Sequence, residues 1–414
     1  MTDPSAALTA IDEAVAAEAD ACLRFLAELV RRPSDNPPGD CAPHARHTAG
    51  LMRELGFAVE EHPVPDDLVK GAGMISATNL IVRRRFGDGP TVALNAHGDV
   101  VPPGEGWSTD PYGAEIRDGW LYGRGAAVSK SDIAAYAFAL RALERSGVPL
   151  AGAVELHVTY DEETGGDIGP RHILASGLSR PDYAICAGFS YQVVTAHNGC
   201  LHLEVTLKGR SAHAALPDSG RDAIAALGDV IGAIYAHGRE LARRRSRLPG
   251  ITAPSCVVGR VAGGINTNVV ADRALLRVDR RIIPEEDFAT AEAELRAVIE
   301  RASAAHAGIA LEIRPLLRAM PLRPHEAARP LIAAVSRHAE RVLGEALPQV
   351  AVPLYTDARH YAEAGIPTLI YGAGPRTLLE ANGHRADERV PVDTLAIAAR
   401  VVASALAELL AAQG

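Results

Sequence analysis

The stretch that decides the fold is Leu94–Pro102, which reads LNAHGDVVP. The apolar run at 91–94 predicts a buried strand, and Pro102 ends any strand that reaches it. His97 therefore stands at the carboxyl end of a strand, where its imidazole can face a cleft, and Asp99 can hold the far ring nitrogen. This arrangement is typical of a metal-binding histidine, although a structural histidine fits the same pattern.

The composition describes a globular protein of more than one domain. The 414 residues exceed one ordinary hydrophobic core, and 48% of them are hydrophobic. The net charge of −9, with no basic stripe, argues against nucleic-acid binding. Five scattered cysteines form no CxxC pair, so we expect no disulfide framework and predict a cytoplasmic location. We also expect no signal peptide, no membrane anchor and no membrane-spanning segment.

Strands and helices alternate in the first part of the chain and again near its end. Period-2 or apolar patterns predict strands at 57–63, 76–83, 91–94, 153–160, 182–187 and 366–371. Helical periodicity predicts helices at 9–30, 41–55, 130–145, 327–343 and 392–412. This order predicts an α/β domain with a mainly parallel central sheet flanked by helices.

A different pattern occupies the middle of the chain. It predicts strands at 201–207, 255–261, 274–283 and 309–313, with helices at 222–243 and 284–304. The order β-α-β-β-α-β is that of the ferredoxin-like split βαβ module. We therefore expect an inserted domain at 195–316 within a domain built from 1–194 and 317–414.

Two further stretches carry side chains suited to catalysis. Glu162 and Glu163 follow a predicted strand, and adjacent carboxylates there point in different directions, so one can bind a metal while the other acts as a base. A solvated acidic turn fits that pair equally well. His384 lies in the polar loop 382–388 before the last predicted helix, a setting in which histidines are commonly just exposed.

Together these stretches resemble the co-catalytic zinc exopeptidase family of aminoacylases, succinyl-diaminopimelate desuccinylases, glutamate carboxypeptidases and allantoate amidohydrolases. The resemblance rests on the His97 stretch, the Gly-Arg-Gly at 123–125, the Glu-Glu pair with Gly-Gly at 165–166, and His384. It covers essentially the whole chain. It implies a zinc-exopeptidase-like fold, hydrolysis of a C–N amide bond in a small carboxylate-bearing substrate such as an N-acyl amino acid, dipeptide or ureido acid, and a homodimer.

The resemblance also implies roles for single residues of the first domain. His97 resembles the ligand of one zinc, with Asp99 behind it, and Glu163 and His384 resemble ligands of the other. Glu162 resembles the general base that activates the attacking water.

In the insert, which the family uses for dimerisation or as a lid, the stretch at 209–214 matches a Gly-x-x-Ala-His pattern. His213 therefore resembles the histidine that reaches the partner subunit's active site and stabilises an oxyanion. Asn268 and Arg281 resemble groups that hold the substrate carboxylate, a task for which the planar guanidinium is well suited. Ordinary lid structure is the alternative for these last two residues.

Two acids of the family pattern are missing from this chain. Val128 stands at the position of the Asp that bridges both metals, and Gly188 stands at the acid that follows the strand at 182–187. Neither residue can bind an ion through its side chain. Two divalent ions a few ångströms apart repel strongly, and the bridging carboxylate offsets that repulsion. An ordinary two-zinc centre is therefore not expected.

Three hypotheses stay open within the resemblance. In the first, one zinc or other divalent ion is held by His97, Glu163 and His384, which is a known catalytic zinc set. In the second, catalysis is metal-free and Lys130 supplies positive charge. In the third, the protein is a non-catalytic relative that binds a carboxylate ligand. An unrelated two-domain binding protein is a fourth interpretation.

Overall fold

The computed structural model describes residues 4–412, and the chain divides into two compact units. Unit 1 consists of the residues up to Thr195, Pro324–Gln349 and the residues from Thr356 onward, and unit 2 consists of Ala196–Arg323 and Val350–Tyr355. None of the five cysteines, which lie within the described residues, forms a disulfide. No helix within residues 4–412 combines the length and the apolar character needed to cross a bilayer.

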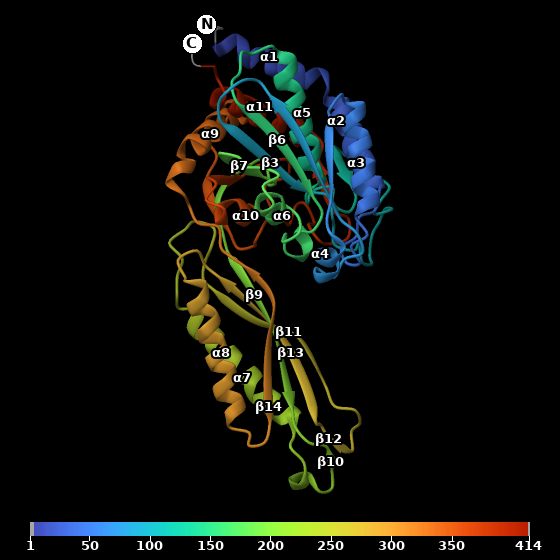
Figure 1. Cartoon of the computed structure of the whole chain (residues 1–414), viewed down its shortest axis with the longest axis vertical. Helices are drawn as coiled ribbons and strands as arrows, with labels where there is room; N and C mark the ends of the chain where they lie inside the picture. The colour runs from blue at the N-terminus through green and yellow to red at the C-terminus, as the bar shows by residue number, and fades with distance from the viewer. Residues whose placement is uncertain (1–3, 413–414) are drawn as a thin grey trace. The chain divides into compact units, whose positions relative to one another are not determined.

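Unit 1 is built on a large mixed sheet (Figure 1). Its strands in sheet order are β1 (Val59–Pro63), β2 (Thr78–Arg85), β6 (Ala153–Thr159), β3 (Thr91–His97), β7 (Tyr183–Cys186), β16 (Thr368–Ile370), β8 (Val193–His197) and β15 (Gln349–Val352). The central strands β6, β3, β7 and β16 pair in parallel, whereas β1, β2 and β8 pair antiparallel. The parallel strands therefore end at one edge of the sheet, where His97 terminates β3.

Helices cover both faces of this sheet. The larger layer consists of α1 (Pro4–Ala17), α2 (Ala19–Arg31), α3 (Ala42–Glu54), α5 (Lys130–Ser146), α9 (Arg329–Leu343) and α11 (Asp393–Leu409). On β6, Leu156 packs in the core with α5, while its neighbour His157 hydrogen-bonds the hydroxyl of Tyr361 at 2.7 Å. Since successive strand side chains alternate between faces, α10 (Ala358–Glu363), which contains Tyr361, lies on the opposite face beside α6 (Pro170–Ala175).

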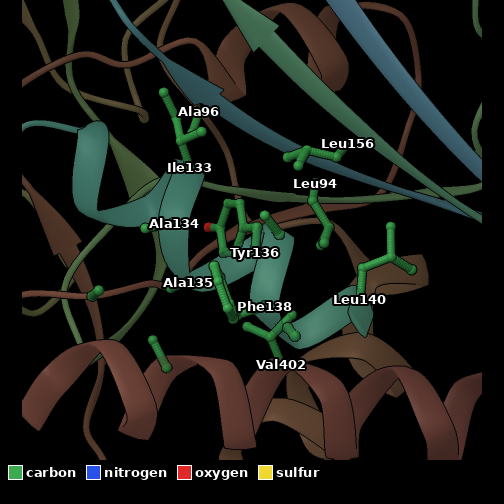
Figure 2. Close-up of a cluster of buried hydrophobic side chains, with 14 of the residues drawn as sticks. Leu94, Ala96, Ile133, Ala134, Ala135, Tyr136, Phe138, Leu140, Leu156 and Val402 are labelled. Carbon is green, nitrogen blue, oxygen red and sulfur yellow. The ribbon is translucent and has the colours of Figure 1, made fainter. Parts of the chain in front are cut away.

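Helix α5 is the centre of the hydrophobic core. Figure 2 shows its side chains between β3, β6 and α11, with Tyr136 surrounded by Leu94, Ala96, Leu156 and Val402. The helix is apolar on nearly all sides because other elements surround it. It ends at Gly147, whose φ of 63° is a left-handed conformation that glycine adopts without a Cβ penalty. This rigid layer fixes the strand ends that carry the polar cluster described below.

Short elements complete unit 1. They are α4 (Asp66–Gly71), the 3-10 turns η1 (Glu162–Thr164) and η3 (Glu326–Ala328), and a three-stranded sheet of β17 (Arg389–Pro391), β5 (Trp120–Tyr122) and β4 (Glu115–Arg117).

Unit 2 is a four-stranded antiparallel sheet with two helices on one face. Its strands in sheet order are β11 (Ser255–Gly263), β13 (Arg273–Ile282), β9 (Gly199–Lys208) and β14 (Ala310–Ala319), and its helices are α7 (Ala223–Leu241) and α8 (Phe288–Ala304). A two-stranded ribbon, β10 (Ala212–His213) with β12 (Val269–Val270), and the turn η2 (Pro217–Ser219) complete it. The chain order of the main elements is the predicted β-α-β-β-α-β.

The predicted α/β fold, with parallel strands at the centre of the sheet and helices on both faces, is confirmed, but two predicted helices were wrong in detail. The helix expected at 9–30 breaks at Glu18, whose carboxylate hydrogen-bonds Arg141 of α5, so that α1 and α2 both pack on α5. The helix expected from residue 284 begins only at Phe288. Asp287 is its N-cap, because its side chain accepts from the Thr290 N–H at 2.8 Å.

A candidate metal centre and its polar cluster

His97 ends β3 with its ring fixed on one side. Its Nδ1 lies 3.0 Å from the backbone oxygen of Asp99 and 3.4 Å from the carboxylate Oδ1 of the same residue. A carbonyl oxygen only accepts, so Nδ1 carries the hydrogen and the neutral ring keeps a lone pair on Nε2. The main partner is thus the backbone of Asp99 rather than the expected carboxylate. Nε2 faces Glu162, whose Oε2 is 3.9 Å away.

The carboxylate of Asp99 joins three segments that are distant in sequence. It is fully buried and accepts from Nδ2 of Asn36 at 2.9 Å. It also accepts from the backbone N–H groups of Glu162 at 3.3 Å and Glu163 at 3.2 Å. Asp99 therefore positions the two glutamates through their backbone, in addition to supporting His97. Asn36 had no sequence signal beyond its place in a turn-rich loop.

Glu162 and Glu163 lie in η1, directly after β6. The turn ends at Gly165 and Gly166, which have φ values of 124° and 70°. A Cβ on Gly166 would lie 2.2 Å from Oδ1 of Asp357, so only glycine fits between the turn and α10. The Gly-Gly pair thus allows the carboxylate turn to pack against the opposite helix layer.

His384 approaches the cluster from the C-terminal loop. Its Nε2 lies 3.2 Å from Oε1 of Glu163, and about half of its side chain is exposed, at 50%. The loop conformation includes left-handed residues at Asn382, His384 and Asp387. Glu388, at the end of this loop, is held by a buried ion pair with Arg124.

The structure therefore gathers four of the predicted side chains at the ends of β3 and β6. His97, Glu162 and Glu163 each offer a donor atom within 4.8 Å of the other two, and His384 contacts Glu163. Imidazole and carboxylate donors suit zinc and related divalent ions. This donor set fits one ion and includes Glu162, whereas the sequence predicted His97, Glu163 and His384 as the ligands.

Val128 and Gly188, the two positions at which the resemblance implies acids, provide no side-chain donor for a second ion. The side chain of Val128 packs against the hydrophobic core, while its N–H donates to Glu388. A Cβ on Gly188 would lie 2.6 Å from Cγ2 of Ile370, so the space of a longer side chain is taken by that isoleucine. The space beside residue 188 is therefore filled by Ile370, and Val128 is part of the core packing.

The side chains of Lys130 and Asp132 both form hydrogen bonds with backbone groups. Nζ of Lys130 donates to the carbonyl of Arg32 at 3.1 Å, and burial lowers the pKa of Lys130 to about 7. Oδ1 of Asp132 accepts from the N–H of Ala373 at 2.7 Å, and burial raises the pKa of Asp132 well above its usual value. These contacts give Lys130 and Asp132 a structural role in this part of unit 1.

Burial and crowded carboxylates dominate the electrostatics of the cluster. Burial, with Glu163 and Asp99 nearby, raises the pKa of Glu162 to about 8 against the opposing effect of His97. Burial alone would lower the pKa of His97, but Glu162 and Asp99 raise it well above its ordinary value. The close contact with the Glu163 carboxylate raises the pKa of His384. These shifts show that the crowded carboxylates disfavour their own ionisation, and a bound cation would favour their charged forms.

Two further buried acids lie next to this cluster, and Asp357 among them had not been predicted as a site residue. Asp161 and Asp357 are buried, and burial raises the pKa of Asp357 to about 8 with Glu162 as the next cause. Asp357 accepts from the hydroxyl of Thr159 at 3.3 Å, and Arg359 donates to the carbonyl of Gly165. In the sequence, the polar residues at 356–360 were the one feature that could have indicated Asp357.

Unit 2 separates the other predicted site residues. His213 and Asn268 are exposed neighbours at the two-stranded ribbon, where the N–H of residue 214 bonds the carbonyl of Asn268 at 3.0 Å. Arg281 lies near the opposite end of β13. Since Arg281 is eight positions beyond Arg273 on this strand, the two places are roughly 26 Å apart.

The chain is similar to proteins of one peptidase family. The model of the peptidase family M20/M25/M40 matches residues 93–408. A succinyl-diaminopimelate desuccinylase of Rhodospirillum centenum is 28% identical over 381 residues, covering 89% of this chain and 92% of the relative. An acetylornithine deacetylase of Klebsiella pneumoniae is 34% identical over 241 residues, covering 57% of this chain and 60% of the relative.

Solved structures share the fold at low sequence identity. The di-peptidase Dug1p of Saccharomyces cerevisiae has a TM-score of 0.79 at 13% identity, covering 98% of this chain and 99% of that one. The M20 family metallo-carboxypeptidase Sso-CP2 of Sulfolobus solfataricus has a TM-score of 0.76 at 19% identity, covering 93% and 98%. A Bacillus subtilis protein described as a dinuclear metal-binding peptidase from this family has a TM-score of 0.68 at 18% identity, covering 95% and 99%.

Proposed function

Because the chain belongs to the peptidase family M20/M25/M40, we propose that it hydrolyses the C–N amide bond of a small substrate that carries a carboxylate. An N-acyl amino acid, a dipeptide or a ureido acid has the required groups. The observation that carries this proposal is the position of Glu162, which is partly buried beside Nε2 of His97 and is fixed through its backbone by Asp99. A carboxyl group held there faces the point on which the other donors converge.

We assign the proton transfers to Glu162. Water adds to the carbonyl carbon while Glu162 takes the water's proton, and the same carboxyl then gives that proton to the leaving nitrogen. The C–N bond breaks, which leaves a carboxylate and an amine. A pKa of about 8 suits both steps near neutral pH, since the carboxyl can accept and release a proton there.

We propose that His97, Glu163 and His384 hold one divalent ion, with zinc as the first choice for two imidazoles and a carboxylate. A bound ion would act as a Lewis acid on the substrate carbonyl. The protein's own part is to keep Nε2 of His97 turned toward the site and to keep Glu163 beside His384. Val128 and Gly188 remove the donors for a second ion of the family kind.

Metal analysis tests this assignment. The difference in zinc content between the wild type and a Glu163→Ala variant, after chelator dialysis and zinc loading, counts the ions that depend on the cluster. A difference of about one ion per chain supports the single site. A difference of about two ions would mean that unrecognised ligands restore a dinuclear centre. No difference would contradict metal binding here, whatever the turnover of acyl-amino acids.

We further propose that the protein acts as a homodimer. His213 and Arg281 cannot both touch one small substrate from the same copy of unit 2, because about 26 Å of strand separates their ends of the sheet. In a dimer, one active site would receive His213 from the partner's insert and Arg281 from its own chain. The first would stabilise the oxyanion and the second would hold the substrate carboxylate. The insert at 195–316 is then the dimerisation domain.

Subunit mixing tests the dimer. Homodimers of Glu162→Gln and of His213→Ala are each expected to be nearly inactive. Each mixed dimer contains one site with both groups intact if His213 acts in trans, so equal mixing should restore about one quarter of wild-type turnover. Mixtures that stay inactive after verified subunit exchange would contradict action in trans.

A further inference from the structure

A second group of metal-binding side chains lies in unit 2, on two neighbouring strands. Along β9, Leu201 and Leu203 pack in the core with α7 and α8, so Cys200 and His202 lie on the other face of the sheet. In the antiparallel register, Asp279 of β13 stands directly opposite His202. Strand pairing therefore brings a thiol, an imidazole and a carboxylate together on one sheet face.

The donor atoms of these three residues converge on one point. Sγ of Cys200 lies 3.2 Å from Nε2 of His202 and 3.7 Å from Oδ1 of Asp279. Nε2 of His202 lies 3.1 Å from Oδ2 of Asp279. With metal–ligand bonds of 2.0–2.3 Å, tetrahedral zinc places its donor atoms roughly 3.3–3.6 Å apart. The observed separations are close to that spacing.

A thiol–histidine–carboxylate relay has a different geometry. In such a relay the thiol contacts one ring nitrogen and the carboxylate contacts the other. Here Cys200 and Asp279 both contact Nε2 of His202, so the carboxylate cannot hold the far side of a ring that activates the thiol. Convergence on a single ring nitrogen is the arrangement that a shared ion requires.

The surroundings allow an ion to enter and restrict its kind. The Cys200 side chain is buried, whereas His202 and Asp279 keep 35% and 30% of their side chains exposed, which leaves a solvent side for entry and for a fourth ligand. Arg281 donates to both oxygens of Asp279, at 3.0 and 3.1 Å, and orients the carboxylate. Its positive charge disfavours hard cations bound by charge alone, so the thiolate becomes the decisive donor.

We propose that Cys200, His202 and Asp279 form a second metal site, which binds Zn²⁺ or a chemically similar thiophilic ion and keeps one coordination position open. This site shares no residue with the His97 cluster, since all three of its ligands belong to unit 2. It does not depend on the function proposed above.

Cobalt binding to the full-length protein tests this site. Co²⁺ takes the same donors as zinc, and a thiolate ligand gives it a strong sulfur-to-cobalt absorption in the near ultraviolet. We expect this absorption in the wild type and its loss in Cys200→Ala. The matched control is Cys256→Ala, because Cys256 is a buried cysteine of the same sheet that packs in the core; this variant should keep the absorption.

Two further variants separate the possible outcomes. Glu163→Ala should keep the cobalt–sulfur absorption, since the His97 cluster has only nitrogen and oxygen donors. Should Cys200→Ala fail to fold by circular dichroism, His202→Gln decides, because its side chain is partly exposed: bound cobalt should fall by about one ion per chain. Absence of the absorption in the wild type, its persistence in folded Cys200→Ala, or unchanged cobalt content in His202→Gln would overturn the proposal.

Discussion

Replacing Gly188 by alanine should destabilise unit 1, because the space expected for a metal-binding acid is filled. The new Cβ would lie 2.6 Å from Cγ2 of Ile370 and 3.2 Å from the backbone nitrogen of Tyr371. Overpacking of this kind costs about 1–3 kcal/mol, and the smaller entropy of the unfolded alanine chain returns roughly 0.4–1 kcal/mol. We expect a net loss of about 1–2 kcal/mol in the free energy of unfolding.

A double-mutant cycle identifies Ile370 as the cause. Ile370→Ala alone should cost about 2–5 kcal/mol, because it leaves a cavity in a buried position. The alanine methyl at 188 then fills part of that cavity, so the double variant should be more stable than the sum of the single losses by at least about 1 kcal/mol. Urea denaturation of all four proteins measures the cycle.

The control is Gly50→Ala in α3, where an added Cβ meets no atom within 4 Å. It should stabilise the protein by up to about 1 kcal/mol, as alanine does in a helix. A Gly188→Ala variant as stable as the wild type, or single losses that add without coupling, would refute this account. A confirmed cycle means that restoring the missing metal ligand at 188 also requires a smaller residue at 370.

Three other predictions follow from the site and its surroundings. Glu162→Gln should reduce turnover by at least about 10²-fold while leaving the thermal midpoint unchanged; unchanged turnover would reject Glu162 as the base. His213→Ala should lower turnover by about 10²–10³-fold without a loss of stability, since the side chain is exposed, and a loss below about threefold would count against an oxyanion role. Asp12 pairs with Arg341 and Arg400, and the hydrogen bonds from these arginines, opposing a burial effect, lower the pKa of Asp12 to about 2. Its stabilising effect is therefore present above the unfolded pKa of 3.8 and is lost as pH falls toward 2, so Asp12→Asn should cost about 1 kcal/mol of unfolding free energy at neutral pH and progressively less below about pH 4. If the difference in unfolding free energy between Asp12→Asn and the wild type did not change with pH, packing rather than charge would hold α1 against α9 and α11.

Local patterns in the sequence were sufficient for the class of fold. Apolar runs and helical periodicity are properties of neighbouring residues, so they predicted the strand that ends at His97 and the helix at 130–145 with small errors. The same patterns located Glu162 and Glu163 after a strand, and the family resemblance is confirmed. The roles of these residues, and the domain limits at 195–316, remain predictions.

Only the tertiary structure decided how these groups are held and which of them meet. Asp99 binds the backbone of both glutamates across more than sixty residues of sequence, and Ile370 fills the space beside Gly188 from another strand. Cys200 and Asp279 come together through the register of β9 and β13, while the same strands keep Arg281 far from His213. Strand register and core packing are set by contacts between distant segments, and no local pattern in the sequence contains them.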